Sequence, residues 1–359
     1  MNFSRRDFGK FALASVPAAG ALLSGSSLLA AQDRDAGPGI ASGARKPESV
    51  FAGVLIGVIV PYSYHNEPSD AKAILDDMLF DGLQACEMMS QTAEPYAGAP
   101  AMPNPFAGRG RRGPGRPGPG GPGGRRGPGR FQMTPAMQAA RAKAQAAMTR
   151  WRLSVPMSRY EALRRMYNDA GVNIYGFKLQ LDMTMPDAEF DYAFHVVKAL
   201  GADQLTMEHP SGADANELTD RIGQFATKYK IMVGYHAHTQ ASPTLWNTAM
   251  SQSAYNGINL DVGHYVAAGN HDVLAFVSKN HARITSMHLK DRCYPNHNNG
   301  SNELWGQGDT PLVALLHMMR DGHYGFPGAI ELEYAIPAGS NANIEVARCL
   351  AYAKNALLT

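Results

Sequence analysis

Two histidines separated by one residue, His236 and His238 in the segment YHAHT, stand at the end of an apolar run that begins at residue 230. Side chains alternate between the two faces of a β-strand, so both imidazoles would point to the same side. Such a pair is either a hydrogen-bonded pair within the core or part of a metal or catalytic centre. The second interpretation requires further ligands from other parts of the chain.

Polar residues that could ligate a metal or move a proton stand at the ends of the other apolar runs. They are Glu87, Lys178, Glu208, Asp261 with His264, His288 with Lys290 and Asp291, and Glu331 with Glu333. Each alone could be a satisfied buried polar residue or a helix cap. Together, Glu208, Asp261, His288 and Glu333 form an oxygen and nitrogen set that suits Mn²⁺, Mg²⁺, Co²⁺ or Zn²⁺. Uncompensated like charges at one place would be costly, so we expect one divalent metal ion there, with Mn²⁺ preferred.

The apolar runs have the length and composition of β-strands, and amphipathic segments such as residues 187–201 and 215–229 lie between them. The eight predicted strands cover residues 50–60, 82–89, 173–181, 202–208, 230–236, 257–263, 283–290 and 328–334. Strands separated by helical crossovers predict an α/β fold, a single-domain (β/α)8 TIM barrel over residues 50–359. Catalytic residues of such barrels lie at the C-terminal ends of the strands, where these polar residues stand.

One segment interrupts the alternation directly after the second predicted strand. Residues 96–132 are rich in glycine and proline and hold seven arginines. This composition predicts a disordered insertion. We favour a solvated, variable loop over an electrostatic contact for an anionic polysaccharide, a membrane or a nucleic acid. The alanine-rich residues 134–151 that follow predict a helix that returns the chain to the barrel.

The N-terminal segment is typical of an exported protein. Arg5 and Arg6 precede a weakly apolar stretch of small residues, with a plausible cleavage site after Ala31. We therefore predict a twin-arginine signal peptide at residues 1–31, a linker at residues 32–49, and a periplasmic or secreted protein. A stable membrane anchor fits less well, because a proline, glycines and serines interrupt the stretch.

Charge and cysteine content exclude other classes of protein. The net charge of +2 depends on the arginine-rich insertion, and the remaining chain is mildly acidic, so no nucleic-acid partner is expected. The three cysteines, Cys86, Cys293 and Cys349, are too scattered for a disulfide framework or a CxxC metal site. We interpret them as ordinary thiols.

Several of these segments together resemble the xylose-isomerase-like barrel superfamily, the group of sugar phosphate isomerases and epimerases. The resemblance rests on the ordered set TMEHP, YHAHT, LDVGHYVAAG, SMHLKDR, WGQGD and GFPGAIELEY. It implies one metal ion held by Asp261, His288 and Glu333, with Glu333 preferred to Glu331 for its distance from the glycine that opens the last strand. The family commonly takes another carboxylate from the fifth strand, where this chain has a histidine. The subgroup with His-x-His there has a glutamate on the preceding strand, which matches Glu208.

This assignment leaves roles for the other strand-end residues. With Glu208 as a ligand, His236 is a fifth ligand, an acid or base beside the metal, or a residue that only orients carboxylates. We take His236, Glu208 and Glu333 as the candidate catalytic residues. The candidate substrate-binding residues are Glu87, Lys178, His238, His264, Lys290, Asp291 and Arg292.

A metal that binds a carbonyl oxygen and a neighbouring hydroxyl stabilises the enediolate formed when the intervening carbon loses its proton. The predicted function is that of a metal-dependent isomerase or epimerase acting on a non-phosphorylated sugar or keto-sugar. The alternative is a lyase or dehydratase acting on 3-keto-glycosides or inosose-like substrates. A non-catalytic binding barrel and an endonuclease fit the residues less well. The expected partner is a small-molecule sugar, and a homo-oligomer is left open.

Overall fold

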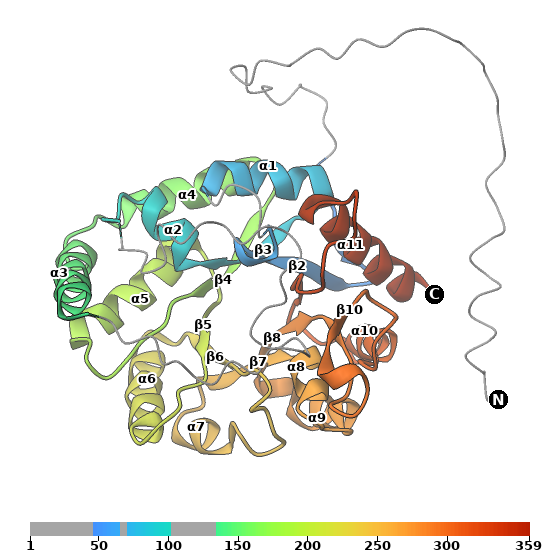
Figure 1. The fold of residues 1–359 in the computed structure, drawn as a ribbon. Coiled ribbons are helices and arrows are strands. Elements are labelled where there is room, and N and C mark those ends of the chain that lie inside the picture. Colours follow the sequence, from blue (N-terminus) through green and yellow to red (C-terminus); the bar gives the residue numbers. More distant parts are fainter. Residues whose placement is uncertain (1–45, 65–69, 102–133) are drawn as a thin grey trace, which may run out of the picture. The chain divides into compact units, whose positions relative to one another are not determined.

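Eight parallel strands close into a barrel in the computed structural model, which describes residues 46–64, 70–101 and 134–359 (Figure 1). The strands are β2 (Val54–Val60), β3 (Ala85–Met89), β4 (Asn173–Lys178), β5 (Gln204–Glu208), β6 (Met232–His236), β7 (Asn256–Asp261), β8 (Ile284–Leu289) and β11 (Gly328–Ile330). β11 pairs with both β8 and β2, and β2 pairs with β3, which completes the barrel. The predicted TIM barrel is confirmed.

The predicted strands are all present, and several are shorter than predicted. The first is divided, because β1 (Val50–Phe51) turns back at Ala52 and Gly53 and pairs antiparallel with β2. Both turn residues have positive φ, 47° and 84°. The last predicted strand leaves the sheet after Ile330, so the two glutamates of IELEY lie just beyond β11.

Helices form an outer ring around the strands (Figure 1). They are α1 (Ala71–Asp81), α2 (Ser90–Tyr96), α3 (Pro135–Arg152), α4 (Ser158–Asp169), α5 (Asp187–Leu200), α6 (Ala215–Tyr229), α7 (Asn247–Gln252), α8 (Val262–Ala267), α9 (Val273–Asn280), α10 (Leu312–Asp321) and α11 (Ala342–Leu358). On α6, Leu218, Ile222 and Ala226 recur every fourth residue and are buried, as an amphipathic helix requires. The predicted alanine-rich helix is present as α3.

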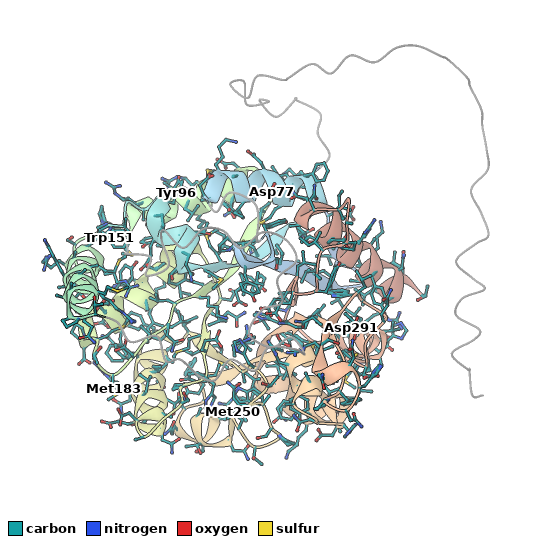
Figure 2. All side chains as sticks on the ribbon, viewed as in Figure 1. Asp77, Tyr96, Trp151, Met183, Met250 and Asp291 are labelled. Atoms are coloured by element: carbon teal, nitrogen blue, oxygen red, sulfur yellow. The ribbon has the colours of Figure 1, made fainter. Side chains whose placement is uncertain are left out.

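Most buried apolar side chains form one core cluster, to which both the strands and the surrounding helices contribute. Figure 2 shows the side chains of all these elements. A second, small cluster of Ala85, Tyr175 and Ala329 is separate from this core. Strand residues alternate between the barrel interior and the helices, so these three residues fill part of the interior. The polar side chains that point inward on the same strands form the site described below.

Several expectations concern residues that the structure does not describe. The predicted signal peptide, the linker up to residue 45 and residues 102–132 of the insertion lie outside the described residues. The unit that contains the barrel begins at Lys46, and buried Ser49 bonds to Gln84 through its backbone N–H at 2.8 Å. Within the described part of the chain, no helix has the length and apolar character needed to cross a membrane.

Candidate metal centre

Four buried side chains converge at the C-terminal ends of the strands. His236 ends β6, Asp261 ends β7, His288 lies in β8, and Glu331 follows β11 directly. One ligand atom from each lies within 4.8 Å of the others. Two imidazoles and two carboxylates at this spacing match the donor types and the size of a divalent metal site.

The local sequence DVGH places Asp261 at the start of a helix. Its side chain is the N-cap of α8, and Oδ1 accepts a hydrogen bond from the backbone N–H of His264 at 2.6 Å. The other carboxylate oxygen, Oδ2, is buried and lies 2.9 Å from the ammonium of Lys290. Gly263 lets the helix approach the next strand, because a Cβ there would lie 2.3 Å from Cγ of Lys290.

His236 is held in one tautomer by Asn259, two residues before the end of β7. The amide nitrogen of Asn259 donates to Ser286 at 2.8 Å and to Glu87 at 3.0 Å, so its oxygen is the atom that accepts from Nδ1 of His236 at 2.9 Å. Burial, assisted by nearby cations, holds the pKa of His236 well below its usual value. The ring is therefore neutral, and its Nε2 is a buried lone pair without a partner.

His288 lies between two carboxylates. Its Nε2 is 3.1 Å from Glu87 and its Nδ1 is 2.9 Å from Glu331. Burial opposes a charge on this ring, but Glu87 and Glu331 outweigh it and raise the pKa of His288 to about 10. A histidine that gives one ring N–H to a carboxylate presents its other nitrogen to a metal. With Nε2 facing Glu87, Nδ1 of His288 is the ring nitrogen that would face a metal ion.

A cation already stands among the carboxylates. The ammonium of Lys290 lies 2.9 Å from Asp261, 3.0 Å from Glu331 and 2.7 Å from Glu333. Burial alone would lower the pKa of Lys290, but these carboxylates, Asp261 first, raise it above its usual value. Together with the unpartnered ring nitrogen of His236, the three carboxylates fit a metal cation, which would displace this ammonium.

Two of the metal ligands expected from the sequence lie outside the four-residue cluster. The Glu208 side chain is 40% exposed at the rim, where it lies 2.8 Å from Lys178 and 3.6 Å from His238. Glu333 borders the cluster, since it contacts Lys290 and accepts a hydrogen bond from Tyr62 at 2.6 Å. His236 and Glu331 occupy the places in the cluster that the sequence had suggested for Glu208 and Glu333.

The candidate substrate-binding residues divide into a floor and a rim. Glu87 is fully buried beneath His288 and also accepts a hydrogen bond from Thr206 at 2.7 Å. His238 is exposed and packs against the ring of buried His264, with ring centroids 4.6 Å apart. The nearby guanidinium of Arg292 contacts the His264 ring and donates to the carbonyl of Gly300 at 2.9 Å.

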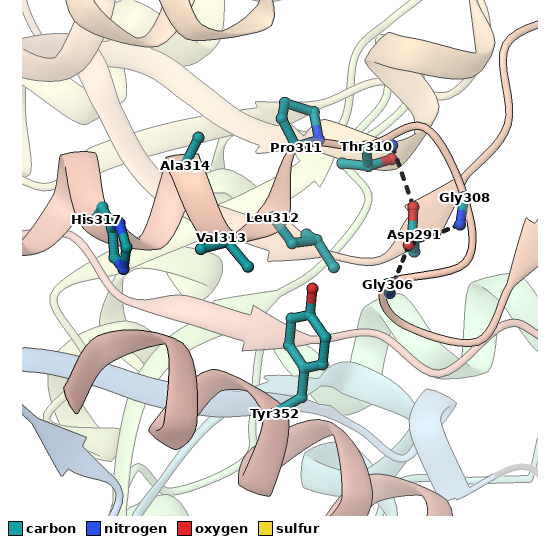
Figure 3. A pocket seen from close by; sticks show the side chains of 10 residues that line it. All are labelled: Asp291, Gly306, Gly308, Thr310, Pro311, Leu312, Val313, Ala314, His317 and Tyr352. Atoms are coloured by element: carbon teal, nitrogen blue, oxygen red, sulfur yellow. Dashed lines mark hydrogen bonds between the residues drawn. The ribbon is translucent and has the colours of Figure 1, made fainter. Parts of the chain in front are cut away.

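Asp291 is not brought to this site. Its carboxylate accepts hydrogen bonds from the backbone N–H groups of Gly306, Gly308 and Thr310 at 2.7, 2.9 and 3.1 Å (Figure 3). These bonds hold the loop that borders a cavity of about 420 Å³ beside α10 and α11. Asp291 therefore anchors a loop, and the side chain that faces the barrel mouth from this segment is Lys290.

Sequence reasoning missed two residues that shape the site. Asn259 lies two residues before Asp261, so the period of a strand places both on one face, and this signal was available. Tyr62 follows the end of β2 and reaches Glu333, but no motif marks it. The sequence places Glu331 at a strand end as well, but the distance from Gly328 favoured Glu333 as the metal ligand.

Comparison with known proteins finds similarity at the level of structure. No protein-family profile and no curated protein matches the chain. A xylose isomerase domain protein from Planctomyces limnophilus matches with a TM-score of 0.53 and 14% identity, over 84% of this chain and 96% of that one. The 3-keto-D-glucoside 4-epimerase from E. coli matches with a TM-score of 0.52 and 11% identity, over 84% and 99% of the two chains.

A dehydratase has a similar structure. The probable 3-DHS dehydratase from Bacillus anthracis matches with a TM-score of 0.53 and 11% identity, over 83% of this chain and 97% of that one. Proteins with different activities thus share this barrel, so the likeness describes the fold and leaves the reaction to the site. This chain has the TIM-barrel fold of the xylose isomerase domain proteins.

Proposed function

We propose that this protein is a divalent-metal-dependent isomerase or epimerase that acts on sugars. The observation that carries the proposal is the buried cluster of His236, Asp261, His288 and Glu331 at the C-terminal end of the barrel, with a lysine ammonium among its carboxylates. A cluster there lies at the end of the barrel where enzymes of this fold carry their catalytic residues. The 3-keto-D-glucoside 4-epimerase from E. coli shows that a barrel of this fold can carry a reaction of this class.

The four cluster residues would hold the metal, and Mn²⁺ is the ion we propose; two nitrogens and two carboxylates also suit Mg²⁺, Co²⁺ or Zn²⁺. When bound, the ion supplies a Lewis acid for a carbonyl oxygen of the substrate. Asn259 and Glu87 fix the rings of His236 and His288 so that one nitrogen of each faces the ion. This assignment uses His236 as a ligand and frees Glu208 for another role.

Glu208 is the group we assign to proton transfer. Its carboxylate is exposed at the rim, and Lys178 lies 2.8 Å away and keeps it in place. Removal of the proton from a carbon next to a carbonyl gives an enediolate. Return of the proton to the other face gives an epimer, and return to the neighbouring carbon gives an isomer. His238, 55% exposed beside Glu208, would bind a substrate hydroxyl.

The substrate we propose is a non-phosphorylated sugar or keto-sugar. The cations nearest the rim already have partners, because Lys178 pairs with Glu208 and Arg292 donates to the carbonyl of Gly300. A phosphate would have to break one of these contacts, whereas hydroxyl groups can bind beside them.

We also propose export by the twin-arginine route, which rests on Arg5 and Arg6 and on the small-residue stretch that follows. Expression of the full chain and of a variant with both arginines changed to lysine tests this. The unchanged chain should appear in the periplasmic fraction in mature form, and the variant should stay in the cytoplasm. Equal distribution of the two proteins would contradict export by this route.

The reaction is tested by incubating the metal-loaded protein with ketoses and 3-keto-glycosides in D₂O. We expect a rearranged sugar with deuterium bound to carbon, and no reaction with the metal-free protein. Release of the group β to the carbonyl would instead identify the lyase alternative, which begins with the same proton removal; the probable 3-DHS dehydratase has a barrel of the same fold. If neither product forms and no carbon-bound deuterium appears, the proposed function is wrong.

A further inference from the structure

We propose that Cys293, His297 and Asp309 bind a structural zinc ion, with Glu303 as the fourth ligand. The site belongs to the loops after β8 and is separate from the four-residue cluster at the barrel mouth. The proposal goes beyond the proposed function, and it does not depend on it.

The loops after β8 bring the three residues together from distant points in the segment. Cys293 follows the short strand β9 (Asp291–Arg292), which pairs antiparallel with β10 (Asn302–Glu303). His297 lies in the turn between them, and Asp309 lies after β10, before α10. Their ligand atoms, one thiol, one imidazole nitrogen and one carboxylate oxygen, all lie within 4.8 Å of one another.

The distances within two pairs of these residues suit a small ion after modest movement. Glu303 lies outside the set of mutually close ligand atoms and would join it from the side of Cys293. Nδ1 of His297 lies 2.6 Å from Asp309, and Sγ of Cys293 lies 3.8 Å from Oε1 of Glu303. A tetrahedral zinc ion with bonds of about 2.0–2.3 Å holds its ligand atoms roughly 3.3–3.7 Å apart. The thiol and carboxylate are already near that separation, and the imidazole and carboxylate would move apart by less than about 1 Å.

The surroundings resemble a closed site more than an open catalytic one. Cys293 is buried, the Asp309 side chain is 14% exposed, and only His297 is largely exposed, at 56%. Glu303 is oriented by hydrogen bonds from Ser301 at 2.6 Å and Asn298 at 2.7 Å, as ligating carboxylates commonly are. Four protein ligands leave no position for substrate, which is the arrangement of structural zinc sites.

The donor atoms also separate this site from the barrel mouth by metal preference. The mouth cluster contains nitrogen and oxygen donors and no sulfur. A thiolate favours Zn²⁺ over Mn²⁺ or Mg²⁺, so Mn²⁺ or Mg²⁺ should bind at the mouth and not at this site. A hydrogen bond accounts for each of the pairs His297–Asp309 and Cys293–Glu303 separately. A shared ion would also account for the closeness of Cys293 to His297 and Asp309.

The zinc would fix the segment that carries Arg292. Cys293 is its neighbour in sequence, and the backbone N–H of Asp309 donates to the carbonyl of Arg292 at 2.9 Å. The guanidinium of Arg292 in turn contacts His264 at the edge of the barrel mouth. Zinc would therefore hold the loops in the arrangement that keeps this arginine over the mouth.

Cobalt titration of the reduced, metal-free full chain tests the site. Co²⁺ bound to a thiolate gives an intense near-ultraviolet charge-transfer band, whereas Co²⁺ at the sulfur-free mouth does not. At saturation we expect a band amplitude that corresponds to one thiolate-bound Co²⁺ per chain, and we expect Zn²⁺ to bleach it. It should disappear in Cys293→Ser and persist in Cys86→Ser and Cys349→Ser, whose thiols are buried elsewhere.

Further variants separate this proposal from the one for the barrel mouth. Asp261→Asn should keep the band even where it loses the metal at the mouth. His297→Ala changes a largely exposed side chain, so it should fold normally and bind Zn²⁺ at least about 10-fold more weakly. X-ray absorption of the zinc-loaded chain should show one sulfur neighbour at about 2.3 Å and requires no variant. A sulfur-free zinc environment, or a band that persists in Cys293→Ser, would overturn the proposal.

Discussion

Two buried groups of charged side chains differ in whether their polar atoms have partners. In the first, Arg152 of α3 lies 2.8 Å from Glu94 of α2 and 3.1 Å from Glu189 of α5. Every oxygen of the two carboxylates is hydrogen-bonded, because Tyr192 donates to Glu94 at 2.9 Å and Thr149 donates to Glu189 at 3.0 Å. This closed network joins three helices and has no place for a ligand.

The second group, at the barrel mouth, is open. Nε2 of His236 and Nε2 of His264 are buried without a hydrogen bond, and Oδ2 of Asp261 has only the Lys290 ammonium, 2.9 Å away, beside it. Leaving such atoms unpartnered costs about 1–3 kcal/mol each, so a folded protein keeps them only where something else compensates. The comparison teaches that buried charge alone does not indicate a ligand site, whereas a buried lone pair without a partner among such charges does.

The largest expected effect is on turnover in Glu208→Gln, a change at the rim of the barrel mouth and outside the cluster that would hold the metal. Glutamine keeps hydrogen bonds at the rim but cannot take a proton, so turnover should fall by about 10²–10⁴-fold. Metal content should stay at the level of the unchanged protein, because Glu208 lies outside the cluster. Steady-state kinetics and metal analysis of the same preparation measure both quantities.

Asp261→Asn is the matched control for that variant. Asparagine caps a helix as well as aspartate does, so α8 should survive while the ion loses an anionic ligand. Metal content and turnover should therefore fall together in Asp261→Asn. If Glu208→Gln loses the metal and His236→Gln keeps it, the ligand set suggested by the sequence is right and our exchange of the two roles is wrong.

The closed network should affect stability instead of chemistry. Arg152→Met leaves two buried carboxylates without their cation, and the expected loss in the free energy of unfolding is about 3–5 kcal/mol. Arg150→Met, at an exposed position on the same helix, should change it by less than about 0.5 kcal/mol. Urea unfolding measures both values. A change in metal affinity of folded Arg152→Met would mean that the two groups are not independent.

The fold was predictable from the sequence, and so was the end of the barrel that holds the site. Apolar runs at regular spacing with amphipathic helices between them require a parallel sheet, and parallel strands place their C-terminal ends together. The alternation along a strand also separates Lys290 from Asp291, so the prediction of Asp291 as a substrate-binding residue could have been questioned from the sequence. Thr310 and the glycines that hold Asp291 could not be foreseen.

The choice between neighbouring glutamates was not predictable. Glu331 and Glu333 point to the same side, about 6.6 Å apart along an extended chain. Which of them reaches Asp261 and His288 depends on the stagger of β11 against β8, and the chain alone does not determine that stagger. Here Ala329 of β11 is the partner of His288, which places Glu331 beside the imidazole.

A carboxylate outside both groups shows how an isolated unpartnered atom is stabilised. Asp81 ends α1, accepts a hydrogen bond from Tyr64 at 2.7 Å through Oδ2, and has a buried, unpartnered Oδ1. Burial raises the pKa of Asp81 to about 7, so protonation takes the place of a bound cation. No imidazole or ammonium accompanies it among the described hydrogen bonds and ion pairs, in contrast to the barrel mouth.

Asp81→Asn should therefore stabilise the protein in a pH-dependent way. The protonated acid is favoured in the folded state, so its contribution is fully present below the unfolded pKa of about 3.9 and is lost as the pH rises through about 7. Relative to the unchanged protein, Asp81→Asn should gain about 2–4 kcal/mol between pH 4 and pH 8. Urea unfolding at the two pH values measures the gain, and equal differences at both would show that Asp81 titrates normally.

The smallest effect concerns Asn259, which touches the candidate metal ligands without being one of them. Its oxygen accepts from Nδ1 of His236 at 2.9 Å, so Asn259→Ala frees that ring to rotate or change tautomer. Metal affinity should fall by about 10–100-fold, as for other residues that orient a ligating histidine.

Ser286→Ala is the control for this variant. It removes a partner of the Asn259 amide nitrogen at 2.8 Å but leaves the bond to His236, so it controls for general loosening of the interior. If isothermal titration shows equal losses in both variants, then Asn259 contributes only packing. A loss confined to Asn259→Ala means that the Nε2 left open on His236 is a ligand position.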